Sequence, residues 1–209
     1  MTDDRMSGLA LIAGSAGVII TLSLHPSGRI TPGQIDSVAR TLVAVHSLAL
    51  ASLPVWFLGA LGLSRRGPAP HRIATAALVL YGFGVAAMMN AVVFDGLVSP
   101  AVLREIVAAS PSTSEAWHIV FNYNGSLDQA FGEVFVVASS VAIALWSISI
   151  IRTLGRGVAL YGCILGPATV IIVFSGMLSH SPHAFSLLII GQTLWFASVG
   201  VLLCRLPNT

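Results

Sequence analysis

The stretch LDQAFGEVFVVASSVAIALWSISII, residues 127–151, decides the fold class of this chain. From Val134 to Ile151 it contains no charged side chain. A membrane-spanning helix needs about 20 predominantly apolar residues, and this stretch is long enough. The sequence therefore predicts a membrane helix at this position.

The composition of the whole chain favours a membrane protein. Of its 209 residues, 56% are hydrophobic and only 9% are charged, whereas a soluble domain carries about 25% charged residues. Five further apolar runs meet the same length criterion. We therefore predict an all-α integral membrane protein with one membrane domain, residues 1–209, and six helices spanning residues 7–24, 42–63, 73–94, 127–151, 158–178 and 185–203.

The arginines indicate the orientation, because basic residues concentrate in cytoplasmic loops. Three of the ten, Arg29, Arg40 and Arg104, lie in one set of alternate connections. The other seven lie in the opposite set and at the termini: Arg5, Arg65, Arg66, Arg72, Arg152, Arg156 and Arg205. Both termini are therefore predicted to be cytoplasmic, in a bacterial-type inner membrane.

The N-terminal run is predicted to stay attached as the first membrane helix. Asp3 and Asp4 oppose Arg5 ahead of it, and no small-x-small cleavage motif ends it. The longest external connection is residues 98–117, in which PAVLREIVAASP can form a short interfacial helix that ends at Pro111.

The expected partners follow from the same composition. The net charge of +2 and the scattered arginines do not indicate nucleic-acid binding. The lipid bilayer is the expected surrounding, and a second copy or a larger membrane complex is compatible with the sequence.

Polar side chains gather at one predicted depth. Counting about 20 residues outward from each cytoplasmic arginine brings five of the six histidines to the external side. In the fourth helix, a polar stripe of helical periodicity forms if the helix continues through Gly125; otherwise its outer part forms a lid. Lipid cannot solvate such a stripe, so it is expected to face the bundle interior. It comprises His118, Asn122, Ser126, Gln129, Glu133 and Ser140.

Imidazoles and a carboxylate suit Zn, Fe or Cu. The candidate metal ligands are His25, His46, His118, Glu133, His180 and His183. A single haem is the alternative, with His46 paired with His118 or His25 as axial ligands, and Asn90 and Asn122 as further cofactor contacts. Glu133 and Asp95 are the candidate catalytic bases for metal-assisted hydrolysis of a lipid-phase substrate.

Two other functions stay open at this point. A small transporter could use Glu133 and the polar stripe. However, the inner half of the fourth helix reads VAIALWSISII, which favours a site on one side over a through-path. The third candidate is a structural subunit of a membrane complex.

Overall fold

A computed structural model describes residues 3–26, 32–66, 71–176 and 182–206, and every regular element in these ranges is helical. Six helical stretches are long and apolar enough to cross a membrane, with α3, η2 and α4 together forming one of them. The elements are α1 (Asp3–Leu24), the 3₁₀ turn η1 (Pro32–Gln34), α2 (Ile35–Arg66), α3 (His71–Val93), the π-type turn η2 (Phe94–Val98), α4 (Ser99–Ala108), α5 (Pro111–Ile150), α6 (Arg156–Phe174) and α7 (Pro182–Arg205). The prediction of an all-α chain with six apolar spans is confirmed.

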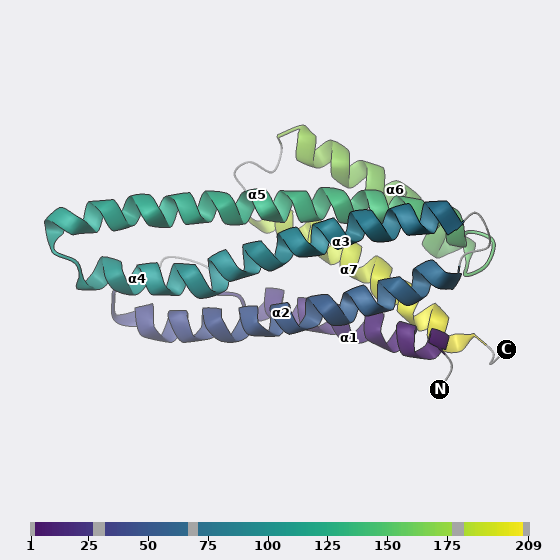
Figure 1. Ribbon diagram of the computed structural model, residues 1–209, viewed down its shortest axis with the longest axis horizontal. Coiled ribbons are helices and arrows are strands. Elements are labelled where there is room, and N and C mark those ends of the chain that lie inside the picture. The colour runs from purple at the N-terminus through teal and green to yellow at the C-terminus, as the bar shows by residue number, and fades with distance from the viewer. Residues whose placement is uncertain (1–2, 27–31, 67–70, 177–181, 207–209) are drawn as a thin grey trace.

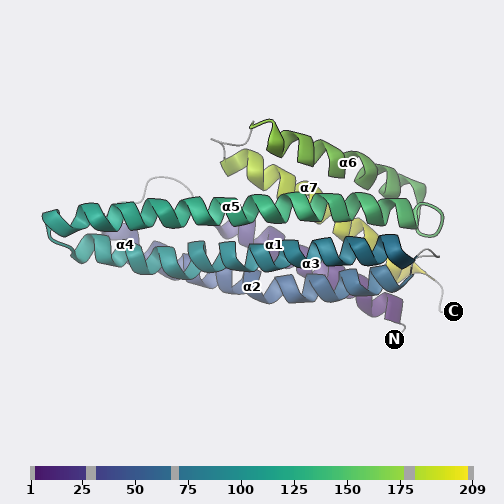
Figure 2. The same cartoon turned by 45° about the horizontal axis from the view of Figure 1, so that its top comes forward.

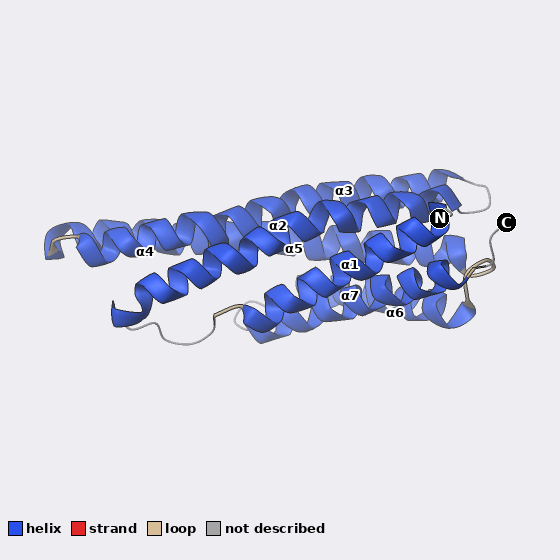
Figure 3. Ribbon diagram, turned by 90° about the horizontal axis from the view of Figure 1, so that it is seen from below, coloured by secondary structure: helices blue, strands red, loops and turns tan. Residues whose placement is uncertain are grey.

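The helices form an elongated bundle in which α1 begins and α7 ends at the same end (Figure 1). We call this the terminal end and the opposite one the far end. At the far end, α2, α4 and α5 extend beyond α1, α6 and α7 (Figures 1 and 2). Helix α1 lies alongside α2 and α7 (Figure 3). At the terminal end, Arg66 Nη2 lies 3.3 Å from Asp4 Oδ2 and joins α2 to α1.

Large aromatic side chains fill the terminal half of the bundle. The Trp56 ring lies 4.8 Å from that of Phe196, and the Tyr81 ring lies 5.4 Å from that of Trp146. Trp195 stacks on Trp146, with ring centroids 6.3 Å apart. All five side chains are buried. Because protein interiors are close-packed, these rings form the aromatic core of this half of the bundle.

The segment predicted as a long external connection, residues 98–117, is almost entirely helical. Helix α3 continues through η2 into α4, and α5 already begins at Pro111. The short helix expected before Pro111 corresponds to α4. The apolar-run criterion placed the start of the fourth span near Leu127 because it detects only the lipid-compatible part of a helix. Pro111 stands at the first turn of α5, where its missing N–H costs no hydrogen bond.

Helix α5 also passes through Gly125 without a break. The sequence left two alternatives at this position, a continuous helix or a lid. The structure has the continuous helix, so the outer half of α5 is a rigid extension of its apolar half.

Candidate metal centre

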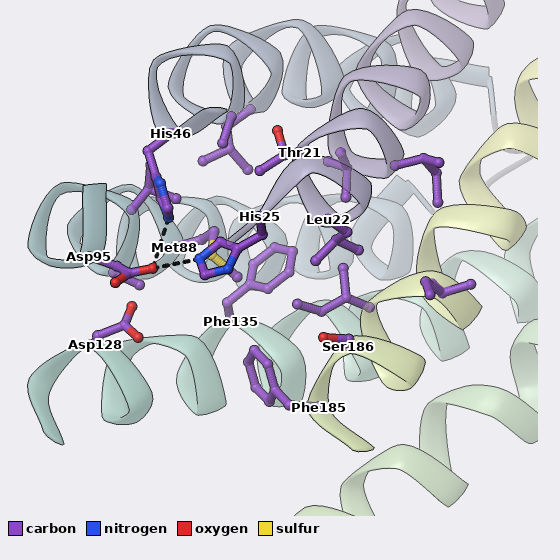
Figure 4. A pocket seen from close by; sticks show the side chains of 18 of the residues that line it. Thr21, Leu22, His25, His46, Met88, Asp95, Asp128, Phe135, Phe185 and Ser186 are labelled. Atoms are coloured by element: carbon purple, nitrogen blue, oxygen red, sulfur yellow. Dashed lines mark hydrogen bonds and ion pairs between the residues drawn. The ribbon is translucent and has the colours of Figure 1, made fainter. Parts of the chain in front are cut away.

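Three polar side chains from three elements meet near the far end of α1. His25 directly follows α1, His46 lies in α2 and Asp95 lies in η2. His25 Nε2 is 2.9 Å from Asp95 Oδ2, and His46 Nε2 is 3.0 Å from the same oxygen. One potential ligand atom from each residue lies within 4.8 Å of the other two. Figure 4 shows both imidazoles directed at the Asp95 carboxylate.

The other nitrogen of each imidazole is held by the backbone. His46 Nδ1 lies 2.8 Å from Leu42 O, and His25 Nδ1 lies 3.0 Å from Pro26 O. A carbonyl oxygen only accepts hydrogen bonds, so each Nδ1 donates. A neutral imidazole of this tautomer carries its lone pair on Nε2. Both lone pairs therefore point at one carboxylate oxygen, and a positive charge, either a proton or a metal ion, is required between them.

The distances suit a metal ion. Zn²⁺ binds nitrogen and oxygen at about 2.0–2.2 Å, so two tetrahedral ligands lie about 3.4 Å apart. The separations of 2.9 and 3.0 Å from Asp95 Oδ2 to the two Nε2 atoms need to open by only a few tenths of an ångström. Histidine ligands usually donate their second N–H to a carbonyl or carboxylate, which fixes the ring. The three residues could therefore hold a divalent transition metal, each supplying one ligand atom.

The two histidines differ in their surroundings. The His46 side chain is only 6% exposed, whereas that of His25 is 37% exposed. The hydrogen bond from His25 to Asp95 raises the pKa of His25 above its usual value, although partial burial of the ring opposes the rise. A proton at His25 is therefore the natural competitor of a metal ion at this position.

The π-type turn positions Asp95. Buried Asn124 of α5 donates from Nδ2 to Phe94 O at 2.9 Å and to Ser99 Oγ at 2.7 Å, at the two ends of η2. Gly96 packs against His46 so closely that a Cβ at this position would overlap His46 Cβ and Cγ. Single π-type turns inside α-helices occur frequently at functional sites.

A hydrogen bond between α1 and α2 sets the distance between the histidines. Thr21 Oγ1 donates to Val45 O at 3.3 Å. Thr21 lies four residues before His25, and Val45 immediately precedes His46. Holding these two positions together holds both imidazoles at the same height of the bundle.

The three-residue group stands at the polar end of a cavity of about 880 Å³ that opens to the surface of the bundle, since exposed residues such as Ile19 and Gln129 belong to its lining. Side chains from α1, α2, α3, α5 and α7 line it, and most of them are apolar. Asp128 of α5 faces Asp95 across the cavity (Figure 4). The polar residues lining it near the histidines include Asp128, Gln129 and Glu133, and the apolar lining reaches Trp56.

The structure brings only some of the predicted ligands together. His25 and His46 belong to the group. Glu133 lines the cavity but accepts a hydrogen bond from Gln129 Nε2 at 2.9 Å and is not part of the group. His118 is exposed on α5, ten residues from Asp128 and so about 15 Å further along the helix. His180 lies outside the described residues, and of His183 only the backbone, in α7, is described.

The polar stripe predicted on the fourth helix does not face one interior space. His118, Asn122 and Ser126 are exposed on the far extension of α5. Ser140 is buried and accepts a hydrogen bond from Gln192 Nε2 at 2.8 Å, which joins α5 to α7. Asn90 is exposed and donates to Ala86 O within its own helix. Of the stripe, Gln129 and Glu133 reach the cavity.

The pair of histidines favours a single ion over haem. Their ring centroids are 5.2 Å apart with the planes at 72°, and both Nε2 atoms point at one oxygen. Axial imidazoles of a haem instead bind the iron from opposite faces of the macrocycle.

Sequence reasoning gave Asp95 only the role of a base and did not select Asp128, Asn124 or Gly96. Neither a family of known proteins, nor a curated protein, nor a solved structure matches this chain. Function must therefore be argued from the geometry of the site.

Proposed function

We propose that this chain is a membrane metalloenzyme that holds one divalent transition-metal ion between His25, His46 and Asp95. One observation carries the proposal: the Nε2 atoms of both histidines point at Asp95 Oδ2, from distances of 2.9 and 3.0 Å. Ionisable side chains in membrane-embedded helices are costly and usually serve a function. A bound cation would account for the placement of two imidazoles and a carboxylate beside one another, with His46 buried.

The number of ligands supports a reactive role over a structural one. Structural zinc sites are usually closed by four protein ligands, whereas catalytic sites have three and keep a position for water or substrate. Here three ligands border a cavity of about 880 Å³, with Asp128 on the opposite wall. A metal ion in such a site polarises a carbonyl or activates a water molecule.

The cavity supports a one-sided site over a transport path. Its lining reaches Trp56, which packs against Phe196 in the aromatic core of the terminal half. The seven arginines at the terminal end further support an orientation in which the metal-bearing end faces outward from the cytoplasm.

Metal analysis of matched histidine variants tests the proposal. Wild-type protein, stripped with a chelator and reloaded with Zn²⁺, is expected to retain about one ion per chain. His46→Ala should lose it, and His118→Ala, which alters an exposed histidine of the far extension, should keep it. Equal zinc content in the wild type and both variants would contradict the ligand assignment.

A further inference from the structure

The cavity beside the proposed metal centre is large enough for a substrate. Its volume of about 880 Å³ falls in the range of small-molecule sites, about 300–1,000 Å³. Val18, Leu53, Phe135 and Ile189 contribute apolar walls from four different helices. The cavity opens to the surface, since exposed Ile19 and Gln129 belong to its lining, and its mainly apolar walls suit an apolar molecule that enters from the bilayer.

The shape of the cavity indicates a single-chain amphiphile. Along α2 its lining runs from His46 to Trp56, ten residues or about 15 Å of helix. Carboxyl and imidazole groups occupy the end near His46, and the walls below are mainly apolar. A molecule with one polar head and one apolar chain matches this division, with its head at the metal ion.

The charges around the head argue against an anionic headgroup. The described lining contains no arginine, and the chain contains no lysine. Asp95 offsets part of the charge of a divalent ion, and Asp128 and Glu133 place two further carboxyl groups on the opposite wall. A phosphate or free carboxylate would lack a basic partner in a partly desolvated site. An uncharged ester or amide needs none, and its carbonyl oxygen suits the open coordination position.

We infer that the cavity binds a single-chain acyl amide or ester and that the protein hydrolyses its acyl bond, an inference that rests on the proposed metal centre. Water adds its oxygen to the acyl carbon, and the C–N or C–O bond breaks. The water proton passes to the Asp128 carboxylate and from there to the departing nitrogen or oxygen. The products are a fatty acid and an amine or alcohol.

The position of Asp128 suits this transfer. Its carboxyl group faces the ligand group across the cavity (Figure 4). It forms no hydrogen bond within the described part of the chain, so it is available to water or substrate, whereas Glu133 is engaged by Gln129.

A series of fluorogenic N-acyl aminocoumarins of increasing chain length tests the inference on the zinc-loaded, detergent-solubilised protein. Wild type should release the coumarin. Asp128→Asn should lower the rate by about 10²–10⁴-fold, the usual contribution of a proton-transfer group, with zinc content unchanged. Asp36→Asn is the matched control, because the Asp36 side chain is 80% exposed outside the cavity. An Asp128→Asn variant as fast as wild type would overturn the role of Asp128.

The depth of the cavity gives a second readout that does not depend on loss of activity. Leu53→Phe narrows the cavity and should shift the preferred acyl chain to a shorter length at unchanged zinc content. Leu58→Phe, on the same helix but 60% exposed and outside the lining, should leave the length preference unchanged. An identical shift in both variants would overturn the cavity as the acyl site.

Different results would contradict the substrate inference and the proposed metal site. Zinc-loaded protein that neither binds nor hydrolyses any member of the series overturns the substrate inference and leaves the metal site standing. Protein that binds no zinc overturns both. Binding of an alkyl phosphate as tightly as an acyl amide of the same chain length overturns the argument from headgroup charge.

Discussion

Gly96 and His46 lie in direct contact between η2 and α2, with no room for a side chain at position 96. The same η2 turn carries Asp95, one residue earlier. The contact therefore fixes the height of the His46 ring relative to the carboxylate that it faces. Because a methyl group at Gly96 would overlap the ring base, the geometry of the candidate centre depends on this glycine.

Replacement of Gly96 by alanine should disrupt the centre. We expect Gly96→Ala to weaken Zn²⁺ binding by about 10–100-fold, as changes in the support of metal ligands usually do, and to destabilise the protein by about 1–3 kcal/mol. Gly125→Ala is the control, since a Cβ there meets nothing within 4 Å. Calorimetric zinc titration and thermal unfolding measure both effects; equal behaviour of the two variants would contradict the account.

Asn124 should contribute more than its neighbour Asn122 to the stability of the protein and to Zn²⁺ binding. Asn124→Ala removes the amide that bonds Phe94 O and Ser99 Oγ, leaving a part-buried and a buried acceptor without that donor. We expect a loss of about 1–3 kcal/mol in the free energy of unfolding and weaker Zn²⁺ binding. Asn122→Ala alters an exposed side chain of the same helix and should change neither. Denaturant unfolding and zinc titration provide the comparison, and two similar variants would argue against support of η2 by Asn124.

The affinity for Zn²⁺ should depend on pH. The hydrogen bond to Asp95 raises the pKa of His25, and the ion must displace this proton. Affinity should therefore rise with pH until the raised pKa is passed and level off above it.

The stability of the metal-free protein should change with pH in the opposite direction, falling as the pH rises. A raised folded-state pKa means that the protonated His25 stabilises the fold fully below the unfolded value of about 6.5, and that this stabilisation is lost as pH rises through the folded-state pKa. Zinc titrations and thermal unfolding across this pH range measure the two trends. Zinc affinity that is independent of pH would rule out His25 as a ligand.

Glu133 should not contribute to metal affinity. It lines the cavity but is paired with Gln129 and stands outside the ligand group. Glu133→Gln is therefore expected to bind Zn²⁺ as tightly as wild type, whereas Asp95→Asn should bind it at least about tenfold more weakly because a ligand loses its charge. Zinc titration of the two variants side by side tests this prediction. If Glu133→Gln bound Zn²⁺ more weakly than Asp95→Asn, the ion would lie nearer Glu133 than Asp95.

The number of membrane-type helices followed from the sequence because apolar runs report directly on lipid-compatible length. The helical structure of the far end could not be predicted in this way, because the parts of a helix that extend beyond the apolar zone are not apolar. Residues such as Glu115 and His118 lie on α5 but have the polarity of a loop.

The sequence predicted the residue types of the candidate site, histidine and a carboxylate, but only some of the residues that form it. Depth counting correctly brought His25, His46 and Asp95 to one level. It could not select among polar residues at that level, because rotation about each helix axis decides whether a side chain faces the interior. Asn90 is an example, since it is exposed and bonds Ala86 O of its own helix. The π-type turn that aims Asp95 has no sequence signature of its own, apart from the glycine at position 96.

Anomalous diffraction from zinc-soaked crystals tests the central claim most directly. The account predicts one strong peak between His25, His46 and Asp95, about 2.0–2.2 Å from the two Nε2 atoms and a carboxylate oxygen. A crystal of zinc-saturated protein whose only anomalous peaks lie away from these three residues would contradict it.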